Sequence, residues 1–297
     1  MGFMRSGKLL APFALLLLVL LPGCGSGDKS PEPEPDPSPD TGSLPDVNAP
    51  DYWEAAELVW SDEFDGDALD LEKWTFETGA HGWGNNEWQE YVEEGVTDVS
   101  DGTLKITAHK TGPGGHIGDY HSARLNSRKS FTFGRLEFRA KIPEHKGNGI
   151  WPALWMLGSN IGSVGWPDCG EIDIMEYVSY EPGQMHFSLH SKANNHREGT
   201  QVTSGALPLE DIEEAFHTYG ILWTREYLKF YLDDPANVQL YFPRPTPTNA
   251  ENWPFGQPFY FLMNIAVGGD WGGQQGVDDS IFPAVMEVDY VRVYQVK

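Results

Sequence analysis

The sequence contains few cysteines and few basic side chains, and each shortage excludes a class of protein. Its 297 residues contain only two cysteines, Cys24 and Cys169. A fold stapled by several disulfides is therefore excluded. Lysine and arginine together number 20 against 44 aspartates and glutamates, which gives a formal net charge of -24. Such a chain repels phosphates, so we expect no nucleic-acid partner and a neutral substrate.

Long amphipathic helical patterns are also missing. A parallel α/β sheet needs crossover helices, so that fold class is excluded. Short segments that alternate polar and apolar residues recur instead, such as RLEFRAKI at 135–142 and YLKFYLDD at 227–234, and glycine, proline and asparagine clusters separate them. This pattern is typical of strands and turns. It predicts an all-β sandwich of two antiparallel sheets in one domain at 52–297.

The first 51 residues lack this alternation. Residues 1–24 combine basic residues with an apolar run that ends in Leu-Pro-Gly-Cys, which resembles a bacterial lipobox. We expect a signal peptide and a lipidated Cys24, which would make the protein an exported lipoprotein at the outer membrane or cell surface. The alternative is an ordinary signal peptide with an incidental cysteine. Residues 25–51 are rich in proline and acidic residues, which predicts a disordered tether.

Three carboxylates crowd into one apolar segment, GEIDIMEYV at 170–178. On a regular strand Glu171 and Asp173 share one face, whereas Glu176 would point into the core. An unpaired buried carboxylate is costly. The spacing therefore predicts a β-bulge at or near Met175, which would return Glu176 to the face of the other two acids.

Such an acidic row has three interpretations. The first is a solvated strand face. The second is a cation site, because three carboxylates suit calcium or magnesium. The third is a glycosidase site. Like charges at neighbouring positions raise the pKa of at least one carboxyl group, and glycoside hydrolysis needs one protonated acid and one ionised carboxylate.

Aromatic residues around the row favour the third interpretation. Sugar rings stack on aromatic faces through their C–H groups. The tryptophans that could make such contacts are Trp83, Trp151, Trp155, Trp166 and Trp271, and the polar residues that could bind sugar hydroxyls are Asn86, Arg124 and His190. Each of them could instead be a core or turn residue. Cys169 has the strand parity of Glu171, so it either faces the same cleft or packs as a small buried thiol.

These motifs resemble glycoside hydrolase family 16, in its bacterial laminarinase branch. The resemblance rests on GEIDIMEYV, on WPALWMLG before it and on FPAVMEVDYVRVYQ near the end. GWGNNEWQEY, FTFGRLEFRAKIP and MNIAVGGDWGG fit in the expected order. The resemblance implies a concanavalin-like jelly-roll sandwich with a concave cleft. It also implies retaining endo-hydrolysis of the β-1,3 linkages of laminarin-type glucan.

Carried over by position, the resemblance implies a role for each acid. Glu171 matches the nucleophile, Glu176 the general acid/base, and Asp173 the central acid that orients the nucleophile. His190 matches a histidine near the reaction centre, and Arg124, Trp151 and Trp155 match cleft positions. Catalysis would need no cofactor, but a structural calcium is implied, with Glu63, Gly102 and Asp289 as its ligands.

Other functions remain open at this point. On the same fold, the protein could be a β-1,3-1,4-glucanase or a galactan hydrolase such as an agarase. From other classes, it could be a non-catalytic glucan-binding surface lipoprotein or a calcium-organised adhesion domain. For the glucanase we expect a monomer.

Overall fold

The computed structural model describes residues 46–297. The predicted signal peptide at 1–24, with Cys24, lies outside the described residues, and so does most of the predicted tether at 25–51. Within the described range, no helix has both the length and the apolar character that a membrane crossing requires.

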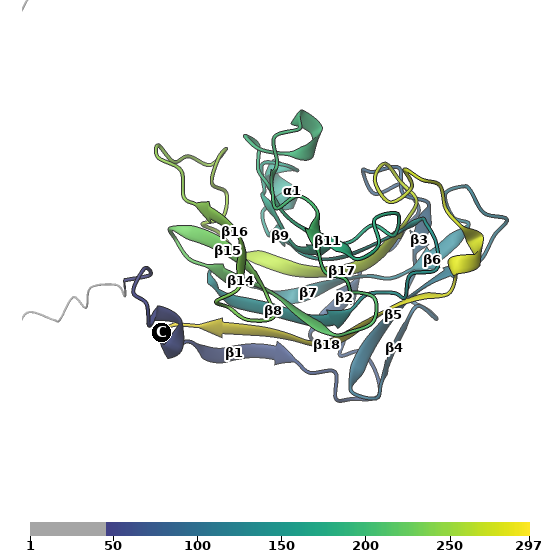
Figure 1. The fold of residues 1–297 in the computed structure, drawn as a ribbon, viewed down its shortest axis with the longest axis horizontal. Coiled ribbons are helices and arrows are strands. Elements are labelled where there is room, and N and C mark those ends of the chain that lie inside the picture. The colour runs from purple at the N-terminus through teal and green to yellow at the C-terminus, as the bar shows by residue number, and fades with distance from the viewer. Residues whose placement is uncertain (1–45) are drawn as a thin grey trace, which may run out of the picture. The chain divides into compact units, whose positions relative to one another are not determined.

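Two β-sheets make up the described domain (Figure 1). In the first sheet the strand order is β16 (Val238–Pro243), β15 (Tyr227–Leu232), β14 (His217–Trp223), β8 (Gly134–Lys141), β18 (Ala284–Gln295), β5 (Thr103–Lys110), β6 (Tyr120–Ser122) and β3 (Gln89–Tyr91). β1 (Glu57–Asp62) also pairs with β18, and β4 (Thr97–Ser100) with β5.

In the second sheet the order is β12 (Val202–Thr203), β11 (Gln184–His190), β10 (Glu171–Glu176), β9 (Ile150–Gly158), β17 (Phe259–Val267), β7 (Arg124–Phe131) and β2 (Trp74–Phe76), with β13 (Leu207–Pro208) paired to β11. The helical segments are short: α1 (Ile161–Val164) and the 3-10 turns η1 (Tyr52–Ala55), η2 (His196–Glu198) and η3 (Asp279–Ile281). Apart from β3 and β6, which run parallel, the paired strands are antiparallel. The predicted all-β sandwich of two sheets is therefore confirmed.

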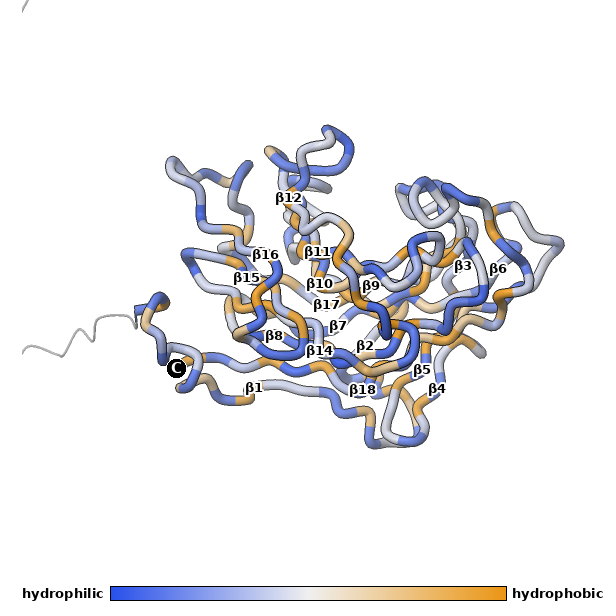
Figure 2. The backbone as a smooth tube through the Cα atoms, in the orientation of Figure 1, coloured by the Kyte–Doolittle hydropathy of each residue, from blue (hydrophilic) through white to orange (hydrophobic). Residues whose placement is uncertain are grey.

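Alternating side chains build the core between the sheets. In β8, Leu136, Phe138 and Ala140 are fully buried, as the alternation of RLEFRAKI predicts. Burying a side chain of the size of Leu or Phe contributes roughly 1.5–3 kcal/mol. Figure 2 shows hydrophobic positions recurring along the strands, while hydrophilic residues gather in the connecting loops.

The packed domain begins earlier than the expected boundary at residue 52. Val47 is buried and packs in one cluster with Leu222, Tyr227 and Tyr231. Its carbonyl oxygen accepts a hydrogen bond from the Tyr227 hydroxyl, at 2.9 Å. The last residues of the predicted tether are therefore part of the fold, because an apolar side chain among the acidic residues finds a site on the first sheet.

Candidate active site

One extra residue in β10 shapes the acidic row. From Asp173 to Glu176 the chain advances three positions, while the paired residues on β9, Trp155 and Ala153, are only two positions apart. The register with β11 slips in the same interval. This is the predicted β-bulge, and Met175 within it is fully buried.

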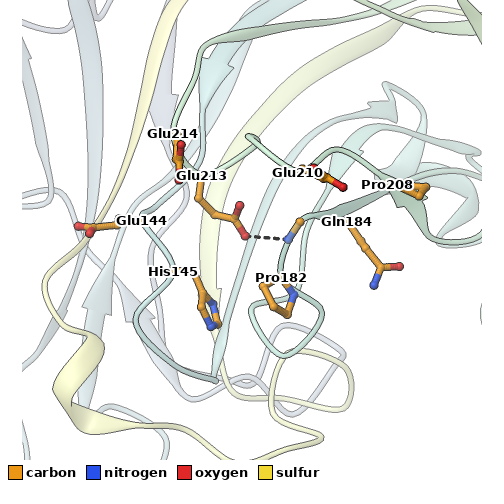
Figure 3. Close-up of a pocket in the computed structure, with 9 residues that line it drawn as sticks. Glu144, His145, Pro182, Gln184, Pro208, Glu210, Glu213 and Glu214 are labelled. Carbon is orange, nitrogen blue, oxygen red and sulfur yellow. Dashed lines mark hydrogen bonds between the residues drawn. The ribbon is translucent and has the colours of Figure 1, made fainter.

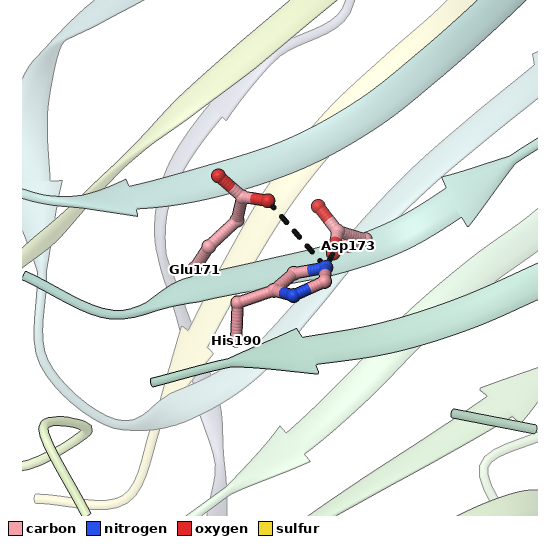
Figure 4. A group of neighbouring side chains, drawn as sticks. All are labelled: Glu171, Asp173 and His190. Atoms are coloured by element: carbon pink, nitrogen blue, oxygen red, sulfur yellow. Dashed lines mark ion pairs between the residues drawn. The ribbon is translucent and has the colours of Figure 1, made fainter. Parts of the chain in front are cut away.

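As a result Glu171, Asp173 and Glu176 share one face of β10, and they form what we call the acidic row. His190 joins the row from the neighbouring strand β11 (Figure 4). Its Nε2 atom lies 3.2 Å from Asp173 Oδ2 and 3.7 Å from Glu171 Oε1. Among residues 46–297, Glu171, Asp173 and His190 are the one group of three or more acidic, histidine or cysteine side chains whose ligand atoms lie close enough together to hold a cation. We assign no metal to this group.

The environment of the row favours protonated carboxyl groups. Burial, and then the charge of Asp173, raise the pKa of Glu171 to about 8. Burial is also the first cause that raises the pKa of Asp173 and of Glu176 well above their usual range. Two buried carboxyl groups and a partly buried one beside them cannot all be ionised at neutral pH, because each charge opposes the next.

Different neighbours support the two outer glutamates. Trp166 Nε1 donates to Glu171 Oε2 at 3.1 Å, and Trp151 Nε1 donates to Glu176 Oε1 at 3.2 Å. Trp271 packs edge-on against Trp151, with ring centroids 5.2 Å apart. Two of the tryptophans expected to contact sugar therefore also donate hydrogen bonds to the acids, which the sequence did not indicate.

Arg124 lies between two further tryptophans. Its guanidinium carbon is 4.8 Å from the ring centroid of Trp83 and 4.7 Å from that of Trp155. Glu77 forms an ion pair with it. Trp155 Nε1 in turn donates to Asn264 Oδ1 at 2.8 Å. The structure thus gathers three of the predicted residues into one stacked group beside the row.

A buried polar network behind this group escaped the sequence reasoning. The carboxylate of Glu87 accepts hydrogen bonds from Asn85, Gln89 and Tyr91. The Tyr91 hydroxyl also accepts a hydrogen bond from Asn264, at 3.0 Å, which links the network to Trp155. Burial raises the pKa of Glu87. These polar residues recur at every second position of NNEWQEY. That spacing is the one feature of the sequence that indicates that their side chains share one face of a strand.

Asn86 joins two loops. Its side chain donates to the carboxylate of Asp270, at 2.9 Å, next to Trp271. Asn86 has a backbone φ of 54°, a left-handed conformation that asparagine tolerates better than most residues. The hydrogen bond from Asn86 to Asp270 therefore connects the loop of Asn86 to the loop that carries Trp271.

Histidines near the row were also missed by the sequence reasoning. His186 pairs with Glu176 across the β10–β11 ladder and contacts Trp271 edge-on, with ring centroids 5.0 Å apart. Burial lowers the pKa of His186. His196 approaches the indole of Trp166 from η2, with ring centroids 4.9 Å apart. Neither histidine was named as a candidate site residue from the sequence.

Comparisons with known proteins decide the family. The model of glycosyl hydrolases family 16 matches residues 84–292. The chain belongs to glycoside hydrolase family 16. It is 47% identical over 263 residues to a beta-glucanase of Rhodothermus marinus, covering 86% of this chain and 89% of that protein. It is 36% identical to glucan endo-1,3-beta-glucosidase A1 of Niallia circulans, covering 80% of this chain and 38% of that protein.

A solved structure agrees with this assignment. The laminarinase from Rhodothermus marinus aligns with a TM-score of 0.74 at 45% identity, covering 81% of this chain and 97% of that one. The predicted resemblance and the jelly-roll sandwich are confirmed. This member of family 16 is thus a glycoside hydrolase.

The three residues expected as calcium ligands lie near one place along β18 in the first sheet. The pairing of β18 with β1 ends at Asp62, one residue before Glu63, and its pairing with β5 ends at Leu104, two residues after Gly102. β1 and β5 pair one after the other with the edge of β18 opposite β8, so Glu63 and Gly102 flank the gap between them at Asp289.

Both carboxylates at this place have guanidinium partners. Arg292 donates to both oxygens of Glu63, at 2.7–3.2 Å, and lowers the pKa of Glu63. Asp289 forms an ion pair with Arg139. The oxygen donors fit the preference of calcium. A bound ion would have to share or replace these arginines, and calcium stays a prediction.

The alternative in which Cys169 faces the cleft is wrong. Its side chain is fully buried and packs with Leu157 and Leu262. Burial, followed by the charge of Glu171, raises the pKa of the thiol to about 12. The parity argument fails because β10 begins only at Glu171, after a turn in which Gly170 has a φ of 78°.

A large cavity of this family 16 domain lies away from the row. It has a volume of 720 Å³ and is lined by Glu144, His145, Pro182, Gly183, Gln184, Pro208, Glu210, Glu213 and Glu214 (Figure 3). Glu213 accepts hydrogen bonds from the Tyr177 hydroxyl and from the Gly183 backbone N–H, both at 2.9 Å. Its carboxylate thus fixes the turn after β10. No residue of the row lines this cavity, so we assign it no part in the reaction.

Proposed function

We propose that the protein is a retaining endo-β-1,3-glucanase that cleaves internal linkages of laminarin-type glucan. The acidic row, completed by the bulge in β10, carries this proposal. A carboxylic acid and a carboxylate on one face supply the two groups of a retaining mechanism. The similarity to the laminarinase of Rhodothermus marinus supports the choice of substrate.

In the first step, Glu176 donates its proton to the glycosidic oxygen as the bond from that oxygen to the anomeric carbon breaks. Glu171 attacks the same carbon from the opposite face, and a covalent glycosyl-enzyme forms. The raised pKa of Glu176 keeps its proton available at neutral pH. The substrate chain beyond the broken bond leaves with a new hydroxyl group.

In the second step, the deprotonated Glu176 removes a proton from water. The oxygen of that water attacks the anomeric carbon, the bond to Glu171 breaks, and the sugar is released with its original configuration. Glu176 regains its proton, so protons and charge balance over the cycle.

Glu171 must be ionised in the first step, although burial and then Asp173 raise its pKa to about 8. His190, the hydrogen bond from Trp166 and the charge of Arg124 lower that pKa and so increase the ionised fraction at neutral pH. Asp173 lies between the glutamates and within 3.2 Å of His190, so we propose that it shares a proton with its neighbours and orients Glu171. The tryptophans and Arg124 beside the row are proposed to bind the glucan.

The test is hydrolysis by the full-length protein in detergent on laminarin, curdlan, lichenan and agarose, with sizing of the products. We expect mixed oligosaccharides from laminarin and curdlan, with β configuration in the first products by NMR. Lichenan or agarose as the best substrate would reassign the linkage, and binding without new reducing ends would refute catalysis.

Variants assign the two roles. Glu171→Gln should lose roughly 10⁴-fold or more in kcat, because no nucleophile remains. Glu176→Ala should also be slow on laminarin, and azide should not restore that activity because the leaving sugar still needs a proton. On an aryl β-glucoside, whose leaving group departs without a general acid, azide should restore turnover because it attacks the glycosyl-enzyme without a general base. Near-wild-type hydrolysis by Glu171→Gln would refute the assignment.

We also propose that the protein is exported and anchored to a membrane through a lipidated Cys24, and that it acts as a monomer around a structural calcium. The lipobox and the acidic segment after it support the anchor. Metabolic labelling with a fatty acid tests it. We expect label in the wild type and none in Cys24→Ser, and an unlabelled wild type would refute it.

A further inference from the structure

The indole of Trp166 is contacted by residues from a later part of the chain. Its Nε1 atom donates to Glu171, at 3.1 Å. The guanidinium carbon of Arg197 lies 4.5 Å from the centroid of the Trp166 ring, and the ring of His196 lies 4.9 Å from it. Arg197 and His196 both belong to η2. One short turn therefore contacts the indole whose N–H donates a hydrogen bond to Glu171, the proposed nucleophile.

The segment that carries η2 is fixed by its own hydrogen bonds. Asn195 is buried, and its side chain donates to the carbonyl oxygen of Ser191 at 3.2 Å and accepts from the backbone N–H of Glu198 at 3.3 Å. The hydroxyl of Thr200 accepts from the backbone N–H of Asn195, at 3.2 Å. Arg197 and His196 are therefore presented from a preformed turn rather than from a free loop.

A separate contact ties this segment to the turn of Trp166. Lys192 Nζ lies 3.3 Å from the carboxylate of Asp168, two residues after Trp166, and 3.0 Å from that of Glu251. Exposed ion pairs of this kind are individually weak. The backbone N–H of Ala193 adds a hydrogen bond to the carbonyl of Glu251, at 2.9 Å. The ion pair of Lys192 with Asp168 thus joins the two turns at a second point, away from the indole, and the contacts with Glu251 fix the η2 segment to a third loop.

We propose that η2 positions the indole of Trp166 so that its N–H stays directed at Glu171, with Arg197 as the main positioning residue. This inference rests on the proposed role of Glu171 as the nucleophile. A guanidinium group over an indole face is attracted by the ring quadrupole. That attraction opposes the side-chain rotation that would break the hydrogen bond to the carboxylate.

Many groups around Glu171 affect its ionisation, and Trp166 is one of them. The others that face it are Asp173 and Glu176 on β10, His190 on β11, Arg124 on β7, Tyr260 on β17 and Cys169 in the preceding turn. Burial and then Asp173 raise the pKa of Glu171, while the hydrogen bond from Trp166 lowers it. A loosely held indole should therefore leave Glu171 harder to ionise.

The test compares Arg197→Met with the wild type on laminarin across pH. We expect kcat to fall about threefold, which matches the loss of a cation–π contact at an exposed site. KM should change by less than about twofold, because the interaction acts on the nucleophile. The acidic limb of kcat/KM should move to higher pH. Arg197→Lys should recover part of kcat because it keeps the cation.

Two further variants separate the explanations. In the Trp166→Phe background, which lacks the donor, Arg197→Met should cause no further loss. Arg135→Met is the matched control, because it removes an arginine 3.9 Å from the ring centroid of Tyr294 on the other sheet, and it should leave the pH profile unchanged.

The outcomes are distinct. A higher KM for Arg197→Met with an unmoved acidic limb would make Arg197 a glucan-binding residue and overturn the proposal. Additive losses in the double variant would overturn it too. If the wild type hydrolyses no glucan, the proposed function fails instead.

Discussion

Asp173 and Glu176 lie on the same face of β10 although three positions separate them. Residues three apart on a regular strand point to opposite faces. Here the register with β9 and β11 slips between the two acids, and the extra residue turns Glu176 back toward Asp173. The bulge therefore decides whether a row of three acids exists at all.

Deleting Met175 should remove the bulge while keeping the acidic row. Glu176 would then follow Asp173 by two positions, so a regular β10 would hold both acids on one face. We expect the variant to keep hydrolysing laminarin, at a reduced rate because Glu176 shifts along the strand, and to have a lower thermal midpoint Tm because the buried Met175 side chain is lost. The control is Met175→Leu, which roughly keeps the buried volume and should cost less than about 1.5 kcal/mol. A folded deletion variant without any activity would contradict this reading of the bulge.

The sequence allowed the bulge to be predicted because two local rules suffice. Strands alternate their faces, and Ile172 and Ile174 mark the buried face without ambiguity. The tryptophan contacts could not be obtained in this way. Whether the N–H of Trp166 meets Glu171 depends on a turn and on η2, and no local pattern encodes that meeting.

The failures have equally specific causes. The parity of Cys169 was counted through Gly170, whose positive φ breaks the strand geometry before β10 begins. The boundary at residue 52 was placed by composition, and a single valine, Val47, was too little to reveal packing that depends on Tyr227 far along the chain. The Glu87 network did leave an alternating polar pattern, but alternation alone does not say which face is buried.

Cys169 should react slowly with thiol reagents in the native protein. Its burial, and the pKa of about 12 that burial gives the thiol, leave almost no exposed thiolate. The experiment uses Cys24→Ser, so that Cys169 is the remaining thiol. We expect little labelling and full activity after long exposure to a bulky maleimide, and complete labelling in guanidinium chloride. Fast native labelling with loss of hydrolysis would restore the interpretation in which Cys169 faces the cleft.

Calcium should raise the Tm without changing kcat. The proposed ligands Glu63, Gly102 and Asp289 lie at β18 in the first sheet, whereas the row is in the second. A ligand that binds only the folded state stabilises it by mass action. We expect a chelator to lower the Tm by several degrees and calcium to restore it.

The matched variants for this prediction are Glu63→Gln and Asp289→Asn. Both should make the Tm insensitive to calcium while hydrolysis continues. A calcium response that survives in both variants would place the ion elsewhere. If the Tm of the wild type does not respond at all, then the ion pairs with Arg292 and Arg139 are sufficient at this place.

Replacing Glu171 should stabilise the domain at alkaline pH. Its pKa is raised from an ordinary 4.5 to about 8, first by burial and then by Asp173. The folded state thus binds this proton more tightly than the unfolded state does. Its contribution to stability is complete below pH 4.5 and is lost as the pH rises toward 8. Glu171→Gln cannot ionise, so its Tm should exceed that of the wild type by roughly 3–10 °C near pH 8. The difference should shrink to near zero at pH 4.

Glu54→Gln, an exposed replacement on η1, is the control and should show no such trend. A Tm difference for Glu171→Gln that stays constant from pH 4 to pH 9 would mean that ionisation of this carboxyl group does not destabilise the folded state.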